Sequence, residues 1–116
     1  MFGAAGAIIS DTEDLRQFFS ALMHGELFRN QTTLDTMLDF NQDDYGLDIG
    51  RIELGEAEIY AHNGGTPGFL SMVNYIPDEE ALIIFAFNQG EIDNFEIESG
   101  VTLDILLLFA LASELP

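Results

Sequence analysis

The stretch from Ala61 to Ser71 constrains the fold of this chain more than any other part of its sequence. It reads Ala-His-Asn-Gly-Gly-Thr-Pro-Gly-Phe-Leu-Ser and separates two segments with the pattern of β-strands. Before it, residues 56–61 alternate polar and apolar side chains, as a half-buried strand does. After it, Phe69–Ile76 is rich in β-forming residues and ends at the turn signal Pro77-Asp78. We therefore predict two strands joined by a glycine-rich loop.

The residues of this loop support two interpretations. A strand ending in His62-Asn63-Gly64-Gly65 exposes backbone N–H groups beside an imidazole, a suitable place to bind an anion or a developing oxyanion. Glycine also permits backbone conformations and close approaches that side chains forbid. Alternatively, the segment only connects two strands and His62 is a solvated side chain, since glycine-rich turns are common. The spacing of the residues leaves both interpretations open.

The charge of the chain excludes several classes of function. Three arginines stand against 21 acidic residues, lysine and cysteine are absent, and the formal net charge is −18. Such a chain repels nucleic acid and anionic membranes, so we expect neither as a partner. The acidic excess suits a high-salt or cation-rich setting, where counterions screen self-repulsion. Without cysteine, disulfides, thiolate nucleophiles and Cys-ligated metals are ruled out.

Length and hydrophobic content predict a single folded domain over residues 1–116, or a piece of one, because 47% of the residues are hydrophobic. The first nine residues lack a basic region and a long apolar run, so we expect no signal peptide. The apolar run at residues 105–112 is much shorter than the roughly 20 residues that a membrane span requires. We expect no membrane span.

A capped amphipathic helix is the clearest predicted element. Ser10, followed by Asp11-Thr12-Glu13, fits a capping box, and Gly25 ends the helix. His24 lies in the last turn, where a partial positive charge suits the helix dipole. One apolar stripe runs along this helix and comprises Leu15, Phe18, Phe19, Leu22 and Met23.

Residues 30–55 predict a second, short helix followed by a strand. Thr32 or Thr33 caps the helix, and the polar residues 41–44 end it. Tyr45–Ile49 alternates in the manner of a strand, and the apolar phase shifts at Gly50, which indicates a bulge. A hairpin at Gly55 leads into the strand before the glycine-rich loop. The inward-facing residues of the short helix are Leu34, Met37 and Leu38.

The remaining segments complete an α+β fold. Ala81–Phe87 is continuously apolar, which is typical of a central strand covered on both faces. Val101–Ser113 is apolar almost all round and predicts a helix buried across a sheet. Because the connections are short, consecutive strands must be antiparallel. We predict an antiparallel sheet of about four strands, flanked by an N-terminal amphipathic helix and a C-terminal apolar helix.

Acidic clusters at residues 43–44, 78–80 and 91–98 raise the alternative of a cation-binding surface module. None has the ligand spacing of an EF-hand loop, so we interpret them as solvated surface. We predict no metal ion and no other cofactor.

Several segments together resemble a known family. They are Ala5–Leu15, Tyr45–Leu47, His62–Ser71 and a strand ending in Asn88, followed by the C-terminal helix. In this order they are similar to the C-terminal part of the serine β-lactamase and penicillin-binding-protein family, class C type, which includes DD-peptidases, esterases and D-amino-acid amidases. The resemblance covers nearly the whole chain and implies a periplasmic or extracellular location.

The resemblance assigns roles to residues of the glycine-rich segment. His62, Asn63 and Gly64 match the position of the family's Lys-Thr-Gly motif, on the strand that edges the active site. The N–H of Gly65 then forms one half of an oxyanion hole, and the nucleophile's own amide forms the other. Asn63, Gly64 and Thr66 are expected to contact the substrate, with His62 and Gly65 as the catalytic pair.

The chain also departs from the family pattern. The family nucleophile belongs to a Ser-x-x-Lys motif, which a chain without lysine cannot contain. Neither Tyr45-Gly46-Leu47 nor Tyr60-Ala61-His62 is the accompanying Tyr-x-Asn motif. In the family these motifs lie upstream, with an N-terminal helix and two strands of the same sheet. We therefore predict that this chain is inactive alone.

Two interpretations of this departure remain open. The chain is either the C-terminal fragment of a complete serine hydrolase or a non-enzymatic acidic interaction module derived from that fold. In both cases the absent strands leave one sheet edge and part of an apolar face uncovered, which favours pairing with another strand. We expect the partner to be the missing N-terminal part or a second copy of the chain.

Overall fold

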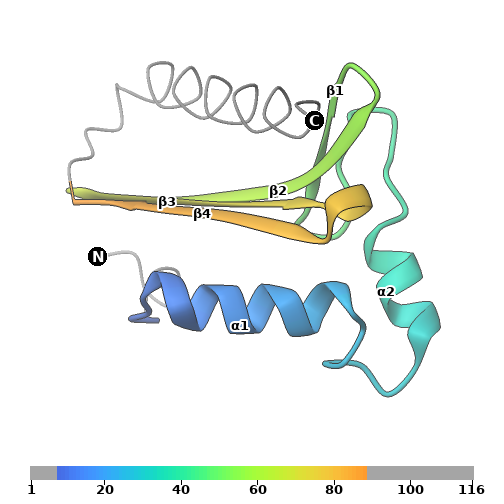
Figure 1. Cartoon of the computed structure of the whole chain (residues 1–116), viewed down its shortest axis with the longest axis horizontal. Helices are drawn as coiled ribbons and strands as arrows, with labels where there is room; N and C mark the ends of the chain where they lie inside the picture. The colour runs from blue at the N-terminus through green and yellow to red at the C-terminus, as the bar shows by residue number, and fades with distance from the viewer. Residues whose placement is uncertain (1–7, 89–116) are drawn as a thin grey trace, which may run out of the picture.

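The computed structural model describes residues 8–88 as a four-stranded sheet with a helical layer (Figure 1). All neighbouring strands are antiparallel, in the order β1-β2-β3-β4, so the predicted α+β class is confirmed. The predicted helix over residues 101–113 lies outside the described residues. The described elements are α1 (Thr12–Met23), α2 (Gln31–Met37), β1 (Gly50–Leu54), β2 (Ala57–Thr66), β3 (Phe69–Ile76), the 3-10 helix η1 (Pro77–Glu79) and β4 (Ala81–Phe87).

Helix α1 lies where the sequence predicted it, but a different residue caps it. Asp11 is the N-cap, because its carboxylate accepts a hydrogen bond from the Asp14 N–H at 2.9 Å. Ser10 instead donates its hydroxyl proton to the Asp11 carbonyl oxygen at 3.3 Å, so the predicted Ser10 cap is wrong. The helix ends at His24, whose Nδ1 lies 2.7 Å from the Ser20 carbonyl oxygen.

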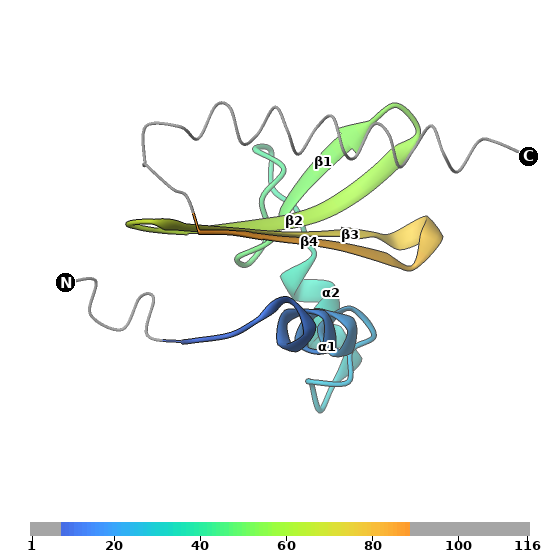
Figure 2. The same ribbon diagram turned by 60° about the vertical axis from the view of Figure 1, so that its left-hand side comes forward.

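One side of α1 packs against the sheet, and the predicted apolar stripe is only partly buried. Figures 1 and 2 show α1 as a separate layer on one face of the sheet, where it contacts β4. Leu22 is buried in this layer. Phe18 is 52% exposed and packs edge to face against Phe19, with ring centroids 5.5 Å apart. The stripe is therefore wider than the surface that α1 buries within the described structure.

The short helix α2 is also confirmed, with a cap that differs from the prediction. Asn30 is the N-cap, and its side-chain oxygen accepts a hydrogen bond from the Thr32 N–H at 3.1 Å. Thr32 and Thr33 lie inside the first turn, so neither is the cap. Leu34 is buried, as its inward position predicted.

The predicted strand over Tyr45–Ile49 is wrong, because the chain reverses direction there. Tyr45 pairs only with Gly50, through an isolated antiparallel bridge. Between them, the Gly46 N–H donates to the Ile49 carbonyl oxygen at 2.8 Å, and Asp48 has the left-handed φ of 58°. The shift of the apolar phase at Gly50 therefore marks a tight turn and not a bulge within one strand.

Two-residue turns close the first two hairpins. Gly55 has φ +65° in the β1–β2 turn, and Gly68 has φ +85° in the Pro67-Gly68 turn, both in the region that favours glycine. Strand β2 runs without a break through Gly64 and Gly65, both of which lie outside the left-handed region. The predicted glycine-rich loop is therefore mostly strand, and only two residues form the turn.

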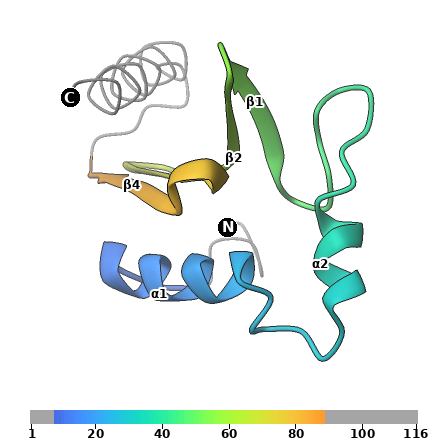
Figure 3. The ribbon, with the colours of Figure 1, turned by 45° about the vertical axis from the view of Figure 1, so that its right-hand side comes forward.

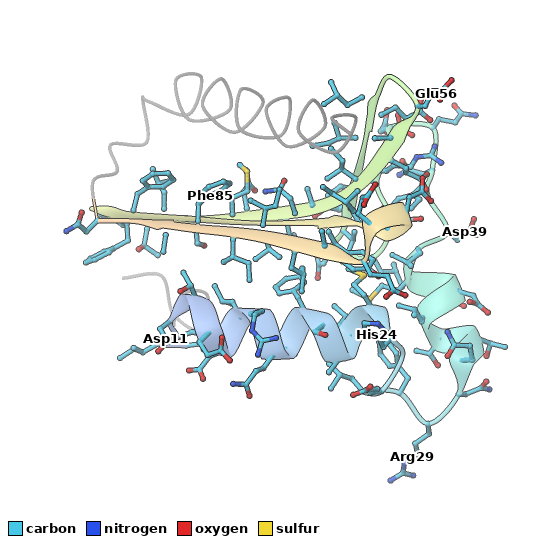
Figure 4. The ribbon with its side chains drawn as sticks, viewed as in Figure 1. Asp11, His24, Arg29, Asp39, Glu56 and Phe85 are labelled. Carbon is cyan, nitrogen blue, oxygen red and sulfur yellow. The ribbon has the colours of Figure 1, made fainter. Side chains whose placement is uncertain are left out.

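The sheet carries apolar side chains on both faces. Val73 and Tyr75 are buried on the face where α1 lies, whereas Phe85 projects from the opposite face (Figure 4). Asn74, on the Phe85 face, is completely buried; its amide donates a long 3.5 Å hydrogen bond to the Ile83 carbonyl oxygen. A cluster on the Phe85 face comprises Ile52, Leu54, Ile59, Ile76, Ala81 and Ile83.

Strand β4 is an edge strand within the described structure. It pairs with β3 through residues 81–87 and with no other described strand. Its side chains are half-buried or exposed along its whole length. The prediction that this apolar run marks a central strand is therefore wrong for the described residues.

The tight turn at residues 45–50 gives a test of local packing. A Cβ atom at Gly46 would collide with the backbone carbonyl oxygen of Met37, which already accepts the Leu47 N–H at 2.9 Å. We expect Gly46→Ala to lower the free energy of unfolding by about 1–3 kcal/mol, the usual cost of overpacking. Urea denaturation measures the change.

Gly50→Ala is the matched control for this test. A Cβ at Gly50 meets its nearest neighbour, the Ala61 carbonyl oxygen, at 3.5 Å, which is ordinary contact. Alanine also weakens a strand less than glycine does, by roughly 0.5–1 kcal/mol. The control should be as stable as the natural chain or slightly more so. Equal denaturation midpoints for the two variants would contradict this account of Gly46.

Candidate functional site

The second half of β2 has an open edge. Strand β1 pairs with β2 only over residues 57–61, whereas β3 pairs with β2 over residues 60–66. Beyond Ala61, the side of β2 facing away from β3 therefore pairs with no described strand. We call this side of His62–Thr66 the open edge. It lies toward the end of the sheet where α1 begins, whereas the β1–β2 turn lies at the other end (Figures 1 and 3).

The register determines which backbone groups face the open edge. A two-residue turn is closed by a hydrogen-bonded pair, so Thr66 bonds with Phe69 and Ala57 with Leu54. Hydrogen-bonded pairs recur at every second residue, so counting from either turn assigns the same hydrogen-bond direction to each residue of β2. Even-numbered residues of β2 direct their N–H and C=O groups toward β3, and odd-numbered residues direct theirs the other way. The N–H groups of Asn63 and Gly65 therefore point outward at the open edge.

The predicted site residues come together on this one strand. His62, Asn63, Gly64 and Gly65 are all exposed, and Thr66 is half-buried. Side chains alternate between faces, so the imidazole of His62 projects from the α1 face and the side chain of Asn63 from the Phe85 face. The outward amides lie between these faces, in the plane of the sheet. Within the described part of the chain this arrangement is an exposed strand edge and not an enclosed pocket.

Close packing against β3 accounts for Gly64. An added Cβ at Gly64 would lie 2.8 Å from the Ser71 hydroxyl oxygen, too close for an unshifted side chain. At Gly65 an added Cβ would lie 3.3 Å from Leu70 Cδ2, a tight contact that the flexible leucine can relieve. Of the two expected roles of glycine, the structure supports close approach at these positions and not an unusual backbone conformation.

An arginine cluster that sequence reasoning missed includes Tyr60, which lies two residues before His62 on the same face of β2. Its members are Phe40, Asp44, Arg51, Glu58 and Tyr60. Arg51 donates from Nε to Asp44 at 3.1 Å and from Nη1 to Glu58 at 3.3 Å, and its guanidinium lies 5.1 Å from the Phe40 ring centroid. The Tyr60 hydroxyl donates to Glu58 at 2.9 Å. The pairing of Arg51 with Tyr60 across the hairpin was predictable once Gly55 was placed in a turn, but the contacts of Asp44 and Phe40 were not.

Two groups of the cluster, Arg51 and Tyr60, have raised pKa values. Hydrogen bonding to Asp44 raises the pKa of Arg51 further above its usual value, so the guanidinium stays charged. Burial, followed by the hydrogen bond to Glu58, raises the pKa of Tyr60 to about 12. Because two carboxylates already pair with Arg51, this arginine offers little net positive charge to an anionic ligand at the open edge.

The described residues contain no group of three or more His, Asp or Glu side chains placed to hold a metal ion. None of their helices is long and apolar enough to cross a membrane. No family model matches the chain, and no solved structure matches it significantly.

Amide hydrogen exchange tests the direction of the β2 amides. The N–H groups of Asn63 and Gly65 face the open edge, so their exchange should be at least about 10-fold faster than that of Gly64, which bonds toward β3. Ala61 is the control, because its N–H points the same way as that of Gly65 but is covered by β1. Two-dimensional NMR in deuterated buffer measures each rate. Equal protection of Gly64 and Gly65 would contradict the proposed register.

Alkaline titration tests the environment of Tyr60. Its folded pKa of about 12 lies above the ordinary tyrosine pKa of about 10, so its contribution to stability is present below pH 10 and is lost between about pH 10 and 12. We expect Tyr60→Phe to remove this part of the alkaline loss of stability, measured as denaturation midpoint against pH. Glu58→Gln keeps the phenol and removes the acceptor charge, which lowers the folded pKa of Tyr60, so the alkaline loss of stability should be smaller and should end at a lower pH. An unchanged alkaline profile in Tyr60→Phe would refute the assignment.

Proposed function

We propose that this chain is the C-terminal segment of a serine hydrolase of the class C β-lactamase type, acting through an acyl-enzyme on an amide, ester or β-lactam. It supplies one wall of the site and one oxyanion donor, and it is inactive alone. One observation carries the proposal: the Gly65 N–H faces an open strand edge directly after the His62-Asn63-Gly64 segment that resembles the family motif.

The chemistry of acyl transfer explains why an outward amide matters. Attack on an ester or amide carbonyl creates a tetrahedral oxyanion, which fixed N–H donors stabilise. Loss of one such donor typically costs about 3–4 kcal/mol of transition-state stabilisation. On β2 the donor belongs to a paired strand, so it needs no rearrangement to meet the oxyanion. In this proposal the second donor is the backbone amide of a nucleophile on the missing segment.

The free edge of the sheet also supports the proposal. The family resemblance implies two further strands from the N-terminal part, and β4 has a side that pairs with no described strand. A strand from the missing part would fill that position and cover an edge that proteins rarely leave bare. His62 would then lie on the same sheet as the nucleophile's supporting elements, two strands away from the completed edge.

A non-enzymatic interaction module is the second candidate. The exposure of His62–Gly65 favours it, because exposed outward N–H and C=O groups pair readily with an extended segment of another protein. In that case the net charge of −18 selects partners without strong negative charge. The two candidates differ in whether a second segment restores hydrolysis.

Complementation tests the oxyanion role of Gly65. The chain is combined with the separately expressed segment encoded immediately upstream, and hydrolysis of a chromogenic cephalosporin and a p-nitrophenyl ester is measured. Gly65→Pro removes the outward N–H and leaves the bonds to β3 intact, so we expect kcat/KM to fall by about 100-fold or more. Gly65→Ala is the matched control, since it keeps the N–H.

Each outcome of this experiment has a clear meaning. Equal activity of Gly65→Pro and Gly65→Ala would remove Gly65 from the oxyanion hole. An upstream segment without Ser-x-x-Lys, or no restored hydrolysis, would favour the interaction module. Turnover by the chain alone above that of His62→Ala would overturn the claim that it is inactive alone.

A further inference from the structure

The outer edge of β4 presents backbone groups in a self-complementary pattern. The closing pair at the Pro67-Gly68 turn fixes the alternation through β3, so odd-numbered residues of β4 bond toward β3. The N–H and C=O groups of Leu82, Ile84 and Ala86 therefore point away from the sheet. These three outward residues are evenly spaced about Ile84, so the edge looks the same to a copy of itself approaching in the opposite direction.

This edge lacks the features that normally prevent strand pairing. Natural edge strands are shortened, bulged, or interrupted by charged residues or proline. Strand β4 reads Ala-Leu-Ile-Ile-Phe-Ala-Phe, with no charge, proline, glycine or bulge over its seven residues. An edge of this length and composition is a strong template for another strand.

We propose that β4 pairs antiparallel with β4 of a second copy of this chain, about a two-fold axis at Ile84. Leu82 then lies opposite Ala86 of the partner subunit, and Ile84 lies opposite Ile84 of the partner subunit. The two four-stranded sheets become one continuous antiparallel sheet. The contact is isologous and closes on itself, which limits assembly to a dimer.

The distribution of charge is compatible with this antiparallel contact despite the net charge of −18. The acidic turn Asp78–Glu80 directly precedes β4, whereas β4 itself is uncharged. Antiparallel pairing places the two acidic turns at opposite ends of a seven-residue contact, roughly 20 Å apart. That separation exceeds the Debye length of about 8 Å at physiological ionic strength. Parallel pairing would place the two turns side by side and is disfavoured.

Helix α1 extends the apolar surface beside the edge. It is the described helix that packs against β4, so the two-fold axis brings both copies of α1 to the same face of the joined sheet. Phe18 on α1 is 52% exposed, and Phe87 at the end of β4, on the opposite face of the sheet, is 41% exposed, so both layers retain exposed apolar area. The dimer does not depend on the proposed hydrolase function. An upstream strand, where present, would compete with the second copy for the same edge.

Light scattering coupled to size-exclusion chromatography tests the dimer. We expect a mass twice the 12.8 kDa of the chain, with association strengthened by salt. Ala86→Pro removes an outward N–H at an exposed position and keeps the bonds to β3, so it should shift the protein to monomer. Ala86→Val keeps that N–H and should remain dimeric. A natural chain that is monomeric at high concentration, or two variants with the same mass, would overturn the proposal.

Cysteine crosslinking tests the register independently of whether the proline variant folds. The natural chain has no cysteine, so the background is zero. Ile84→Cys places two thiols directly opposite each other, at a Cα separation of about 5.5 Å that permits a disulfide. Ala86→Cys places them several residues apart and should not crosslink. Equal crosslinking at both positions, or none at position 84, would overturn the proposed contact.

Discussion

The alternation of backbone hydrogen bonds along β2 is the constraint on which the rest of the structure depends. Two short turns, at Gly55 and at Pro67-Gly68, fix this alternation from both ends of the strand, and they agree. Had the strand contained one residue more or fewer between the turns, the two turns would require opposite hydrogen-bond directions, and β2 could pair with both neighbours only through a bulge. The same count, carried through β3, decides which groups face out at β4. The oxyanion role of Gly65 and the pairing of β4 therefore depend on the same alternation of hydrogen-bond direction.

Hydrophobic periodicity predicted which segments form helices and strands better than it predicted their caps and the turns between them. Helix α1 and the strands on either side of Pro67-Gly68 follow from local patterns, because apolar spacing and turn chemistry act over a few residues. The caps moved to Asp11 and Asn30, since several polar residues near each helix start can accept the same kind of hydrogen bond. At Tyr45–Ile49 a strand-like alternation conceals a reversal that depends on backbone contacts with Met37.

The position of the candidate residues on one strand was predictable from the sequence, whereas their geometry was not. Sequence placed His62–Thr66 together on or beside a strand, but the glycines suggested a loop, because glycine usually weakens strands. Here Gly64 is explained by the nearby Ser71 hydroxyl, a contact between strands that only the register reveals. The arginine cluster was not predicted from the sequence for the same reason. Its members come from three separate segments, and no local pattern connects Phe40 or Asp44 with Arg51.

Asn74 introduces local frustration at the centre of the sheet. Its side chain is fully buried, and its Oδ1 atom has no hydrogen-bond partner in the described structure. An unsatisfied buried acceptor costs about 1–3 kcal/mol, a substantial share of the 5–15 kcal/mol by which domains are stable. Because the side chain is completely buried, a molecule that packs on the Phe85 face cannot reach this oxygen, and the sheet itself carries the cost. Asn74 therefore lowers the stability of the sheet at the point where β3 is otherwise most deeply buried.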